Sequence, residues 1–412
     1  MKTFLFILLT LFLLPGAFAQ LRAVYQAPPE HIAGLRATAN DYPYVVPFAA
    51  MDERFFIEFD DLEGDEKSYY YRIRRMDEHW HPSNLLPQEY IDGFDSDMIQ
   101  TQENSRATLQ PYTHYSFSIP NRNTRIKLSG NYLVEILDED ENVLFNIPVI
   151  FYEKTVSVGL QAKRTNAPAT VATSHMLELT VYAGRLQGAN PASDIRIEIY
   201  RNANLFEPLV LHQPTFNLGN EWRYHDPQKM TVAAGNEFLS FETRRQRGYN
   251  RGVDFSELDD LYHYYLPVYA PSPHYMTYND IDGSYIFDAT GTEHPATGAD
   301  YGPVHFRIAK DLAAGRDIYV VGRFNNWQLS DAYRLRPVEG ADFAETTVLL
   351  KQGYYDYYYV GRHKDGRIDW TAVTPSFAET ENRYTAVVYY RPPGARYVRV
   401  VGMGQAVSKP LK

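Results

Sequence analysis

The stretch RFFIEFDDLEGDEKSYYYRIRRM, Arg54–Met76, indicates the fold class of this chain. Its first half alternates apolar and polar residues, with Phe55, Ile57 and Phe59 on one side. The second half repeats the alternation from Tyr69 onward. Alternation with a period of two is the pattern of a half-buried strand, and the acidic, Gly-containing segment between the halves is typical of a turn. The stretch therefore predicts a strand, a turn and a second strand.

The composition extends this prediction to the whole chain. Among 412 residues there are 34 Tyr and 22 Phe, and aromatic side chains suit pleated, half-buried surfaces, so we predict an all-β protein. The chain has no Cys, which excludes thiol catalysis and thiolate metal sites and leaves core burial to hold the domains together. Its formal net charge of −11 argues against binding to nucleic acid or to an anionic lipid surface.

Similar strand patterns recur along the chain and divide it into blocks. Short strands separated by regular turn signals are typical of β-sandwiches, so we predict tandem immunoglobulin-like or early-set sandwich domains. The predicted division is a signal peptide at 1–19, an N-terminal extension at 20–42, a first sandwich at 43–155, a second sandwich with a long Tyr-rich loop at 156–308, and a third sandwich at 309–412.

The first residues have the pattern of a secretory signal peptide. Lys2 supplies the positive charge, Phe4–Leu14 is apolar except for one Thr, and Ala17-Phe18-Ala19 is a small-x-small cleavage site. We expect cleavage after Ala19 and export of the mature chain. No later stretch approaches the apolar length of a membrane-spanning helix, so we predict no direct membrane insertion.

The sequence assigns no catalytic, cofactor-binding or metal-binding residue, and we predict that the protein is not an enzyme. It contains neither H-E-x-x-H nor G-x-S-x-G. His79 and His81 could offer two zinc ligands, but two ligands do not complete a tetrahedral site, and a loop anchored by Trp80 is the favoured interpretation. Asn279–Ser284, NDIDGS, resembles the front half of a calcium loop but lacks the distal Glu, so we interpret it as a turn. We expect no small-molecule ligand.

Two segments are candidates for contact with a protein partner. ETRRQRGYNRG, Glu242–Gly252, concentrates arginines around a tyrosine in an otherwise acidic chain, a composition found at interface hot spots and suited to an acidic partner surface. A solvated hairpin end is the alternative. The Tyr-rich segment Tyr262–Tyr285 suits either a partner contact or a core. The predicted partner-binding residues are Arg244, Arg245, Arg247, Tyr249, Arg251, Tyr262, Tyr264, Tyr265 and Tyr269.

VVGRFNNWQL, Val320–Leu329, resembles the opening of a glycogen-binding-type β-sandwich. In such modules the Phe-Asn-x-Trp turn is mainly scaffold, so we predict that Phe324 and Trp327 belong to the core of the third domain. Trp370, with Lys364 nearby, could make a sugar platform. A carbohydrate-binding accessory protein that uses the third domain is therefore the alternative function.

Several runs together resemble the periplasmic plug protein of the type IX secretion system, in the order of that family and over nearly the whole mature chain. The runs are FDDLEGDEKSYYYRIRRMDEHWHPSNLLPQEYIDGF, YTHYSFSIPN, SGNYLVEI, GNEWRY, AAGNEFLSFE, YVVGRFNNWQL, GYYDYYYV and ETENRYTAVVYYRPPGARYVRVVG. The resemblance implies a periplasmic protein that binds the periplasmic mouth of the large outer-membrane translocon barrel. It also implies that the protein seals this barrel when no substrate is being exported, without catalysis.

The chain departs from the family pattern at Arg75 and Met76, where the pattern has His and Cys. We interpret both changes as compatible with a surface position.

Overall fold

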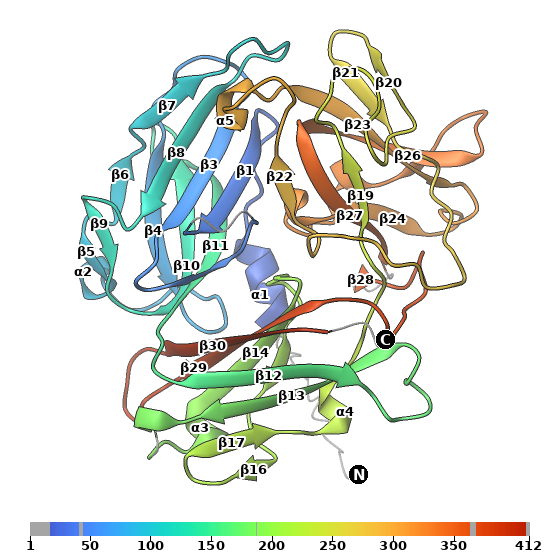
Figure 1. The fold of residues 1–412 in the computed structure, drawn as a ribbon. Coiled ribbons are helices and arrows are strands. Elements are labelled where there is room, and N and C mark those ends of the chain that lie inside the picture. Colours follow the sequence, from blue (N-terminus) through green and yellow to red (C-terminus); the bar gives the residue numbers. More distant parts are fainter. Residues whose placement is uncertain (1–16, 41–43, 187, 363–367, 409–412) are drawn as a thin grey trace, which may run out of the picture.

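The structure is a computed structural model and describes residues 17–40, 44–186, 188–362 and 368–408. The predicted all-β class is confirmed, because strands form three packed β-sandwiches and the helices in the described residues are short. The longest is α1, Ala17–Val24. In Figure 1 the first sandwich lies at the upper left, the third at the upper right, and the second below both. The predicted signal peptide falls mainly on residues outside the described ranges.

The first sandwich packs two sheets around the alternating residues of the opening stretch. Phe55, Ile57 and Phe59 are fully buried in its core, as the alternation predicts. One sheet has the order β1 (Ile32–Ala39), β3 (Phe55–Asp61), β8 (Thr113–Ile119) and β7 (Thr101–Asn104). The other has the order β2 (Phe48–Ala50), β11 (Val143–Tyr152), β10 (Gly130–Leu137), β4 (Tyr70–Met76) and β6 (Ser96–Met98). Outside these sheets lie α2 (Pro87–Tyr90), β5 (Ile91–Gly93) and β9 (Thr124–Ile126).

The second sandwich combines strands from the middle and the end of the chain. One sheet contains β12 (Ser157–Arg164), β13 (Ser174–Tyr182), β17 (Glu221–Tyr224) and β16 (Phe216–Asn217), with β18 (Thr231–Ala233) also paired to β13. The other has the order β15 (Leu209–Leu211), β14 (Ile195–Arg201), β29 (Arg383–Tyr390) and β30 (Arg399–Val407). Its short helices are α3 (Pro191–Asp194) and α4 (Pro227–Met230).

The third sandwich is built around the long strand β27, Gly353–Arg362, and lies between β18 and β29 in the sequence. The strands paired to β27 are β19 (Leu239–Glu242), β22 (Tyr285–Phe287), β24 (Asp317–Val321) and β28 (Ile368–Asp369). The opposite sheet has the order β20 (Phe255–Leu258), β21 (Tyr262–Tyr265), β23 (Tyr301–Ala309), β26 (Phe343–Lys351) and β25 (Arg336–Pro337). The helix α5, Pro295–Gly298, precedes β23.

The sheets therefore group the chain differently from the predicted blocks 156–308 and 309–412. Strands from β19 to β23 belong to the third sandwich, whereas β29 and β30 complete the second. The reason is visible in β29, whose Ala386 and Val388 face the core of the second sandwich while Val387 and Tyr389 face the space between the sandwiches. A strand that is apolar on both faces carries no sequence signal for its partner strand.

A shared apolar core, the central cluster, joins the three sandwiches. It contains Leu21, Phe48, Met76, Trp80, Leu133, Ile150, Tyr200, Ala203, Leu205, Phe206, Phe238, Tyr319, Val321, Trp327, Tyr358, Val360, Val387, Tyr389, Val398 and Val400. Its members come from all three sandwiches and from α1, which lies between them in Figure 1. Burial of this apolar surface makes separation of the sandwiches costly in water. Trp80 therefore anchors the HWH segment as predicted.

The interpretation of Arg75 and Met76 as surface positions is wrong. Arg75 is 4% exposed and Met76 is 1% exposed. The Arg75 guanidinium donates to the Ser129 carbonyl at 3.0 Å and to the Val398 carbonyl of the second sandwich at 2.5 Å. This departure from the family pattern thus lies in the joint between the first and second sandwiches.

A buried ion pair connects the first sandwich to the third. Lys351 Nζ lies 2.6 Å from Asp60 Oδ2, and both side chains are almost completely buried. Tyr301 donates its hydroxyl to Asp60 at 2.5 Å, and His114 Nδ1 lies 2.6 Å from the other carboxylate oxygen. Burial lowers the pKa of Lys351, and the Asp60 charge opposes that shift. Because both charges are removed from water, loss of either side chain would leave the other charge buried without a counter-charge.

Buried carboxyl groups brace the joint between the second and third sandwiches. Glu237 accepts the backbone N–H of Glu381 at 3.0 Å, which ties together the two segments that connect these sandwiches. Asp280 accepts the backbone N–H of Phe238 at 3.0 Å, and Asp356 accepts that of Ile281 at 2.5 Å. The predicted NDIDGS turn is therefore tied to this joint.

Burial, followed by repulsion from Asp356, raises the pKa of Asp280 to about 8. Burial likewise raises the pKa of Asp356 to about 7. Such groups hold protons in the folded chain that the unfolded chain would release.

We predict that Lys351→Met lowers the free energy of unfolding by about 3–5 kcal/mol, because it leaves the Asp60 charge buried without its cation. Lys163→Met is the matched control, since Lys163 pairs with Glu178 while its side chain is 51% exposed, and it should cost less than about 1 kcal/mol. Denaturant unfolding of both variants checks this. Equal losses would contradict the importance of the buried pair.

We also predict that the melting temperature of Asp280→Asn, relative to that of the wild type, rises from pH 5 to pH 9. The folded pKa of about 8 lies above the usual 3.8, so the stability that this group contributes is full at low pH and is lost as pH rises through about 8. The Asn side chain of the variant cannot ionise, so the variant does not lose stability at this position as pH rises.

Asp138→Asn is the control for the pH series. Hydrogen bonds from Asn142 lower the pKa of Asp138, so this carboxyl is ionised at both pH values. Its variant should differ from the wild type by the same amount throughout. A difference for Asp280→Asn that stays constant from pH 5 to pH 9 would refute the prediction.

Candidate interaction surface

The predicted arginine segment forms a concave site at one end of the third sandwich. Residues 243–254 connect β19 to β20, on the side of the molecule away from the second sandwich (Figure 1). Together with neighbouring side chains they line a surface pocket of about 310 Å³, which we call the arginine pocket. Its lining residues are Glu242, Arg244, Arg245, Tyr249, Asn250, Arg251 and Thr290.

A buried amide holds the loop of the arginine pocket in shape. Asn250 is 4% exposed, accepts the backbone N–H of Arg245 at 3.1 Å and donates to the Arg245 carbonyl at 2.7 Å. Gly252 has a φ of +75°, and a Cβ there would lie 2.4 Å from the Ser240 carbonyl oxygen. This position therefore requires glycine, and the loop is preorganised.

The guanidinium groups of the pocket differ in their partners. Arg244 Nε pairs with Asp288 at 2.7 Å, and Arg251 Nε lies 3.4 Å from Glu242. Arg245 makes no ion pair with any acidic residue in the part of the chain that the structure describes. Tyr249 is 76% exposed, which is the largest exposure of any large apolar or aromatic side chain in that part. The pocket thus presents an uncompensated cation beside an exposed aromatic ring.

The remaining predicted contact residues are not in this pocket. Arg247 donates from Nε to the Tyr262 hydroxyl at 2.8 Å. The side chains of Tyr262 and Tyr264 point into the core of the third sandwich, because their segment is the strand β21 rather than a loop.

Tyr265 and Tyr269 have intermediate exposure. Tyr265 stacks between Phe255 and His305, with ring centroids 4.3 and 4.0 Å away, and Tyr269 packs against Tyr359. The structure therefore brings together Arg244, Arg245, Tyr249 and Arg251 and separates the tyrosines from them. Tyr262 and Tyr264 alternate with a period of two, and this alternation is the sequence signal that indicates a strand rather than a loop.

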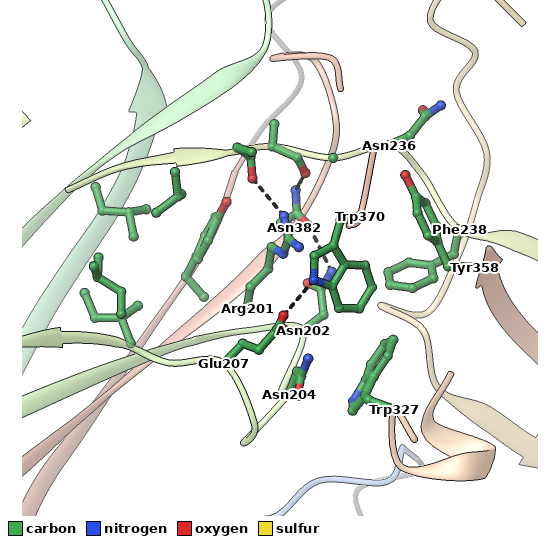
Figure 2. Close-up of a pocket in the computed structure, with 18 residues that line it drawn as sticks. Arg201, Asn202, Asn204, Glu207, Asn236, Phe238, Trp327, Tyr358, Trp370 and Asn382 are labelled. Carbon is green, nitrogen blue, oxygen red and sulfur yellow. Dashed lines mark hydrogen bonds between the residues drawn. The ribbon is translucent and has the colours of Figure 1, made fainter. Parts of the chain in front are cut away.

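A second cavity, of about 280 Å³, lies between the second and third sandwiches (Figure 2). Trp327 is 1% exposed and is a core residue, as predicted, but it lies in the central cluster rather than in the core of the third sandwich. Phe324 packs against the core of the third sandwich. Trp370 donates its indole N–H to Glu207 at 2.6 Å, and the Arg201 guanidinium lies over its ring at 5.2 Å. The indole that the carbohydrate hypothesis needs is thus engaged within the protein. Lys364 lies outside the described residues.

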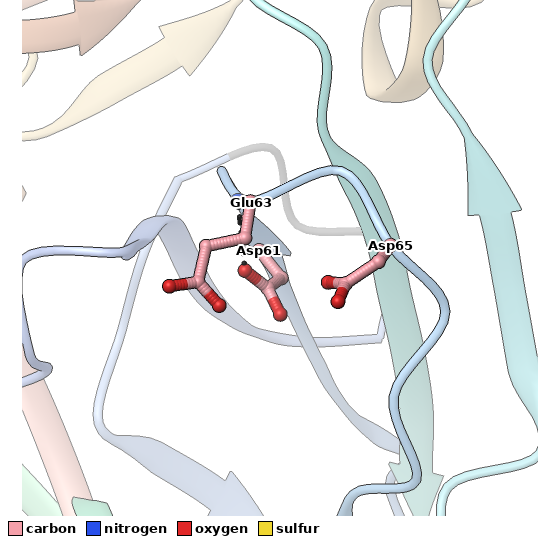
Figure 3. Close-up of side chains that lie close together, drawn as sticks. All are labelled: Asp61, Glu63 and Asp65. Atoms are coloured by element: carbon pink, nitrogen blue, oxygen red, sulfur yellow. Dashed lines mark hydrogen bonds between the residues drawn. The ribbon is translucent and has the colours of Figure 1, made fainter.

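Three carboxylates of the first sandwich lie close enough together to suggest a metal site, namely Asp61, Glu63 and Asp65 (Figure 3). The ammonium group of Lys67 occupies this position. It lies 3.0 Å from Asp61 and 3.4 Å from Asp65, and it also contacts Glu63. A cation supplied by the chain itself therefore lies among these carboxylates, and we assign the cluster no metal.

Comparison with known proteins identifies the first sandwich. Residues 32–153 match the family model described as type 9 secretion system plug protein 1st domain. The first sandwich is a type IX secretion plug domain. The match begins at the first residue of β1 and ends one residue after β11, so it covers both sheets. The predicted resemblance to the plug protein is confirmed.

A solved structure extends the likeness beyond the plug domain. The crystal structure of a hypothetical protein from Parabacteroides merdae is 25% identical, covers 93% of this chain and 98% of its own, and superposes with a TM-score of 0.89. A biofilm associated protein, BSP domain, matches with 6% identity over 93% of this chain and 60% of its own. Its TM-score is 0.17, which is too low to indicate a shared fold. No curated protein matches.

The plug domain and the sandwiches beside it contain no helix, among the described residues, with the length and apolarity that a membrane crossing requires.

We predict that Trp370→Ala lowers the stability of the protein by about 1–3 kcal/mol, because it removes packing on Trp327 and Tyr358 and the hydrogen bond that Glu207 accepts from the indole. Thermal melting measures this effect. Retention of the wild type on a glucan affinity gel, abolished by a Trp370→Ala variant that still folds, would instead support the carbohydrate hypothesis.

Proposed function

We propose that this protein is the periplasmic plug of a type IX secretion system, binding the periplasmic mouth of the outer-membrane translocon barrel and closing it when no substrate is being exported. The observation that carries the proposal is the plug domain at residues 32–153, which supports a plug role in type IX secretion. The predicted signal peptide supports a periplasmic location.

The architecture suits a steric seal. A seal must resist deformation, and the central cluster, the Asp60–Lys351 pair and the carboxyl groups of the joint couple the three sandwiches into one body. Such a body closes an opening by its shape and needs no chemistry.

Two buried histidines have structural partners. His175 lies 2.9 Å from the Tyr384 hydroxyl and 3.0 Å from the Ala378 carbonyl, and burial lowers its pKa. His114 is held by Asp60. These arrangements support a non-enzymatic role, in agreement with the plug family and the all-β fold.

The test is purification of the tagged full chain from envelope extracts of its own cells in gentle detergent. We expect a large outer-membrane barrel protein to co-purify, and an unrelated exported protein with the same tag serves as the control. Deletion of the gene should make the outer membrane leaky to a large antibiotic that is normally excluded. Recovery of a folded chain without any outer-membrane component, together with an intact permeability barrier in the deletion strain, would refute the proposal.

A further inference from the structure

We propose that the arginine pocket binds the carboxylate side chains of an acidic peptide segment on the partner, with Arg245 as the principal cation and Tyr249 as the adjoining aromatic contact. This inference rests on the proposed function and names the chemistry of one contact that the plug makes.

The charge of the pocket selects an acidic partner. The whole chain has a formal net charge of −11, whereas the pocket is lined by Arg244, Arg245 and Arg251 against Glu242. Asp288, outside the lining, pairs with Arg244. Three cations and two anions leave one positive charge, which is that of Arg245. A local cation on an acidic protein attracts a carboxylate and repels other cations, so it sets the orientation of the partner more than it sets the affinity.

The paired arginines keep donors for a ligand. A guanidinium group has five N–H donors, and the ion pairs of Arg244 and Arg251 use the Nε group of each. Asp288 and Glu242 therefore orient these two side chains without saturating them. Fixed guanidinium groups suit carboxylates because the two groups form parallel, charge-assisted hydrogen bonds.

The shape of the pocket favours a peptide segment. A volume of about 310 Å³ admits side chains but not a folded domain, and the walls include the fixed loop held by Asn250. Tyr249 stands exposed at the edge, where an aromatic ring adds contact area at a low cost in conformational entropy. Tyrosine beside arginine is the composition of interface hot spots.

The pocket also lies near the plug domain. Gln246, on the pocket loop, donates to Asp300 at 3.3 Å, and the same carboxylate accepts the backbone N–H of Leu109 at 2.7 Å. Leu109 belongs to the plug domain and is 47% exposed. A segment seated in the pocket can therefore continue over an apolar contact on the plug domain, which joins both modules to one partner.

The first experiment measures binding of a fluorescent Glu-rich peptide to the full chain, with its Gln-rich analogue and inorganic phosphate as further probes. We expect binding of the Glu-rich peptide only, weakening as salt is added. Arg245→Gln should weaken it by about 10-fold, because it removes a charge-assisted contact. Arg122→Gln, at an exposed arginine in the turn between β8 and β9, should leave it unchanged. Binding of phosphate without the peptide, or equal binding by Arg245→Gln, would overturn the inference.

The second experiment repeats the envelope purification with Arg245→Gln and Arg122→Gln, after thermal melting has shown that both variants fold. We expect less barrel protein with Arg245→Gln and an unchanged amount with Arg122→Gln. Wild-type levels with Arg245→Gln would overturn the pocket inference and leave the plug function standing. Absence of a barrel from the wild-type sample would instead count against the plug function itself.

Discussion

The burial of apolar side chains between the three sandwiches is the constraint on which the rest of the structure depends. The chain has no disulfide, so its modules keep their relative positions through packing and polar contacts. The central cluster draws members from every sandwich, and β29 contributes to it with one face while the other face completes the second sandwich. Loss of the cluster would therefore disturb the second sandwich as well as the joints.

Polar contacts at the joints give this apolar contact a definite geometry. Apolar burial has little directional preference, whereas the Asp60–Lys351 pair and the carboxyl groups near Glu237 require fixed partners. Arg75 acts in the same way between the first and second sandwiches, with its guanidinium on backbone carbonyls of both. The seal proposed above needs such alignment, because a shift at the joint between the first and third sandwiches would displace the plug domain from the arginine pocket.

The interaction surface shows how neighbouring residues in one segment take different roles. Arg244, Arg245 and Arg251 meet in one pocket, whereas Arg247 turns to Tyr262. The composition of the segment correctly indicated a cluster of cations. It did not indicate which guanidinium groups would find acidic partners, since Asp288 lies more than 40 residues further along the chain. The Tyr-rich segment carried an alternation that indicates a strand, and its tyrosines accordingly fill a core.

The sequence by itself determined the all-β class and the likeness of residues 32–153 to the plug domain, because alternation and turn residues are local properties and this domain is continuous in the chain. The predicted first sandwich, 43–155, left out β1, which pairs with β3. Only the tertiary structure decided that β29 and β30 return to the second sandwich, that Arg75 is buried, and that Lys351 meets Asp60. These features join residues far apart in the chain. Their energies come from burial and from charges brought out of water, and neither is encoded in the spacing of neighbouring residues.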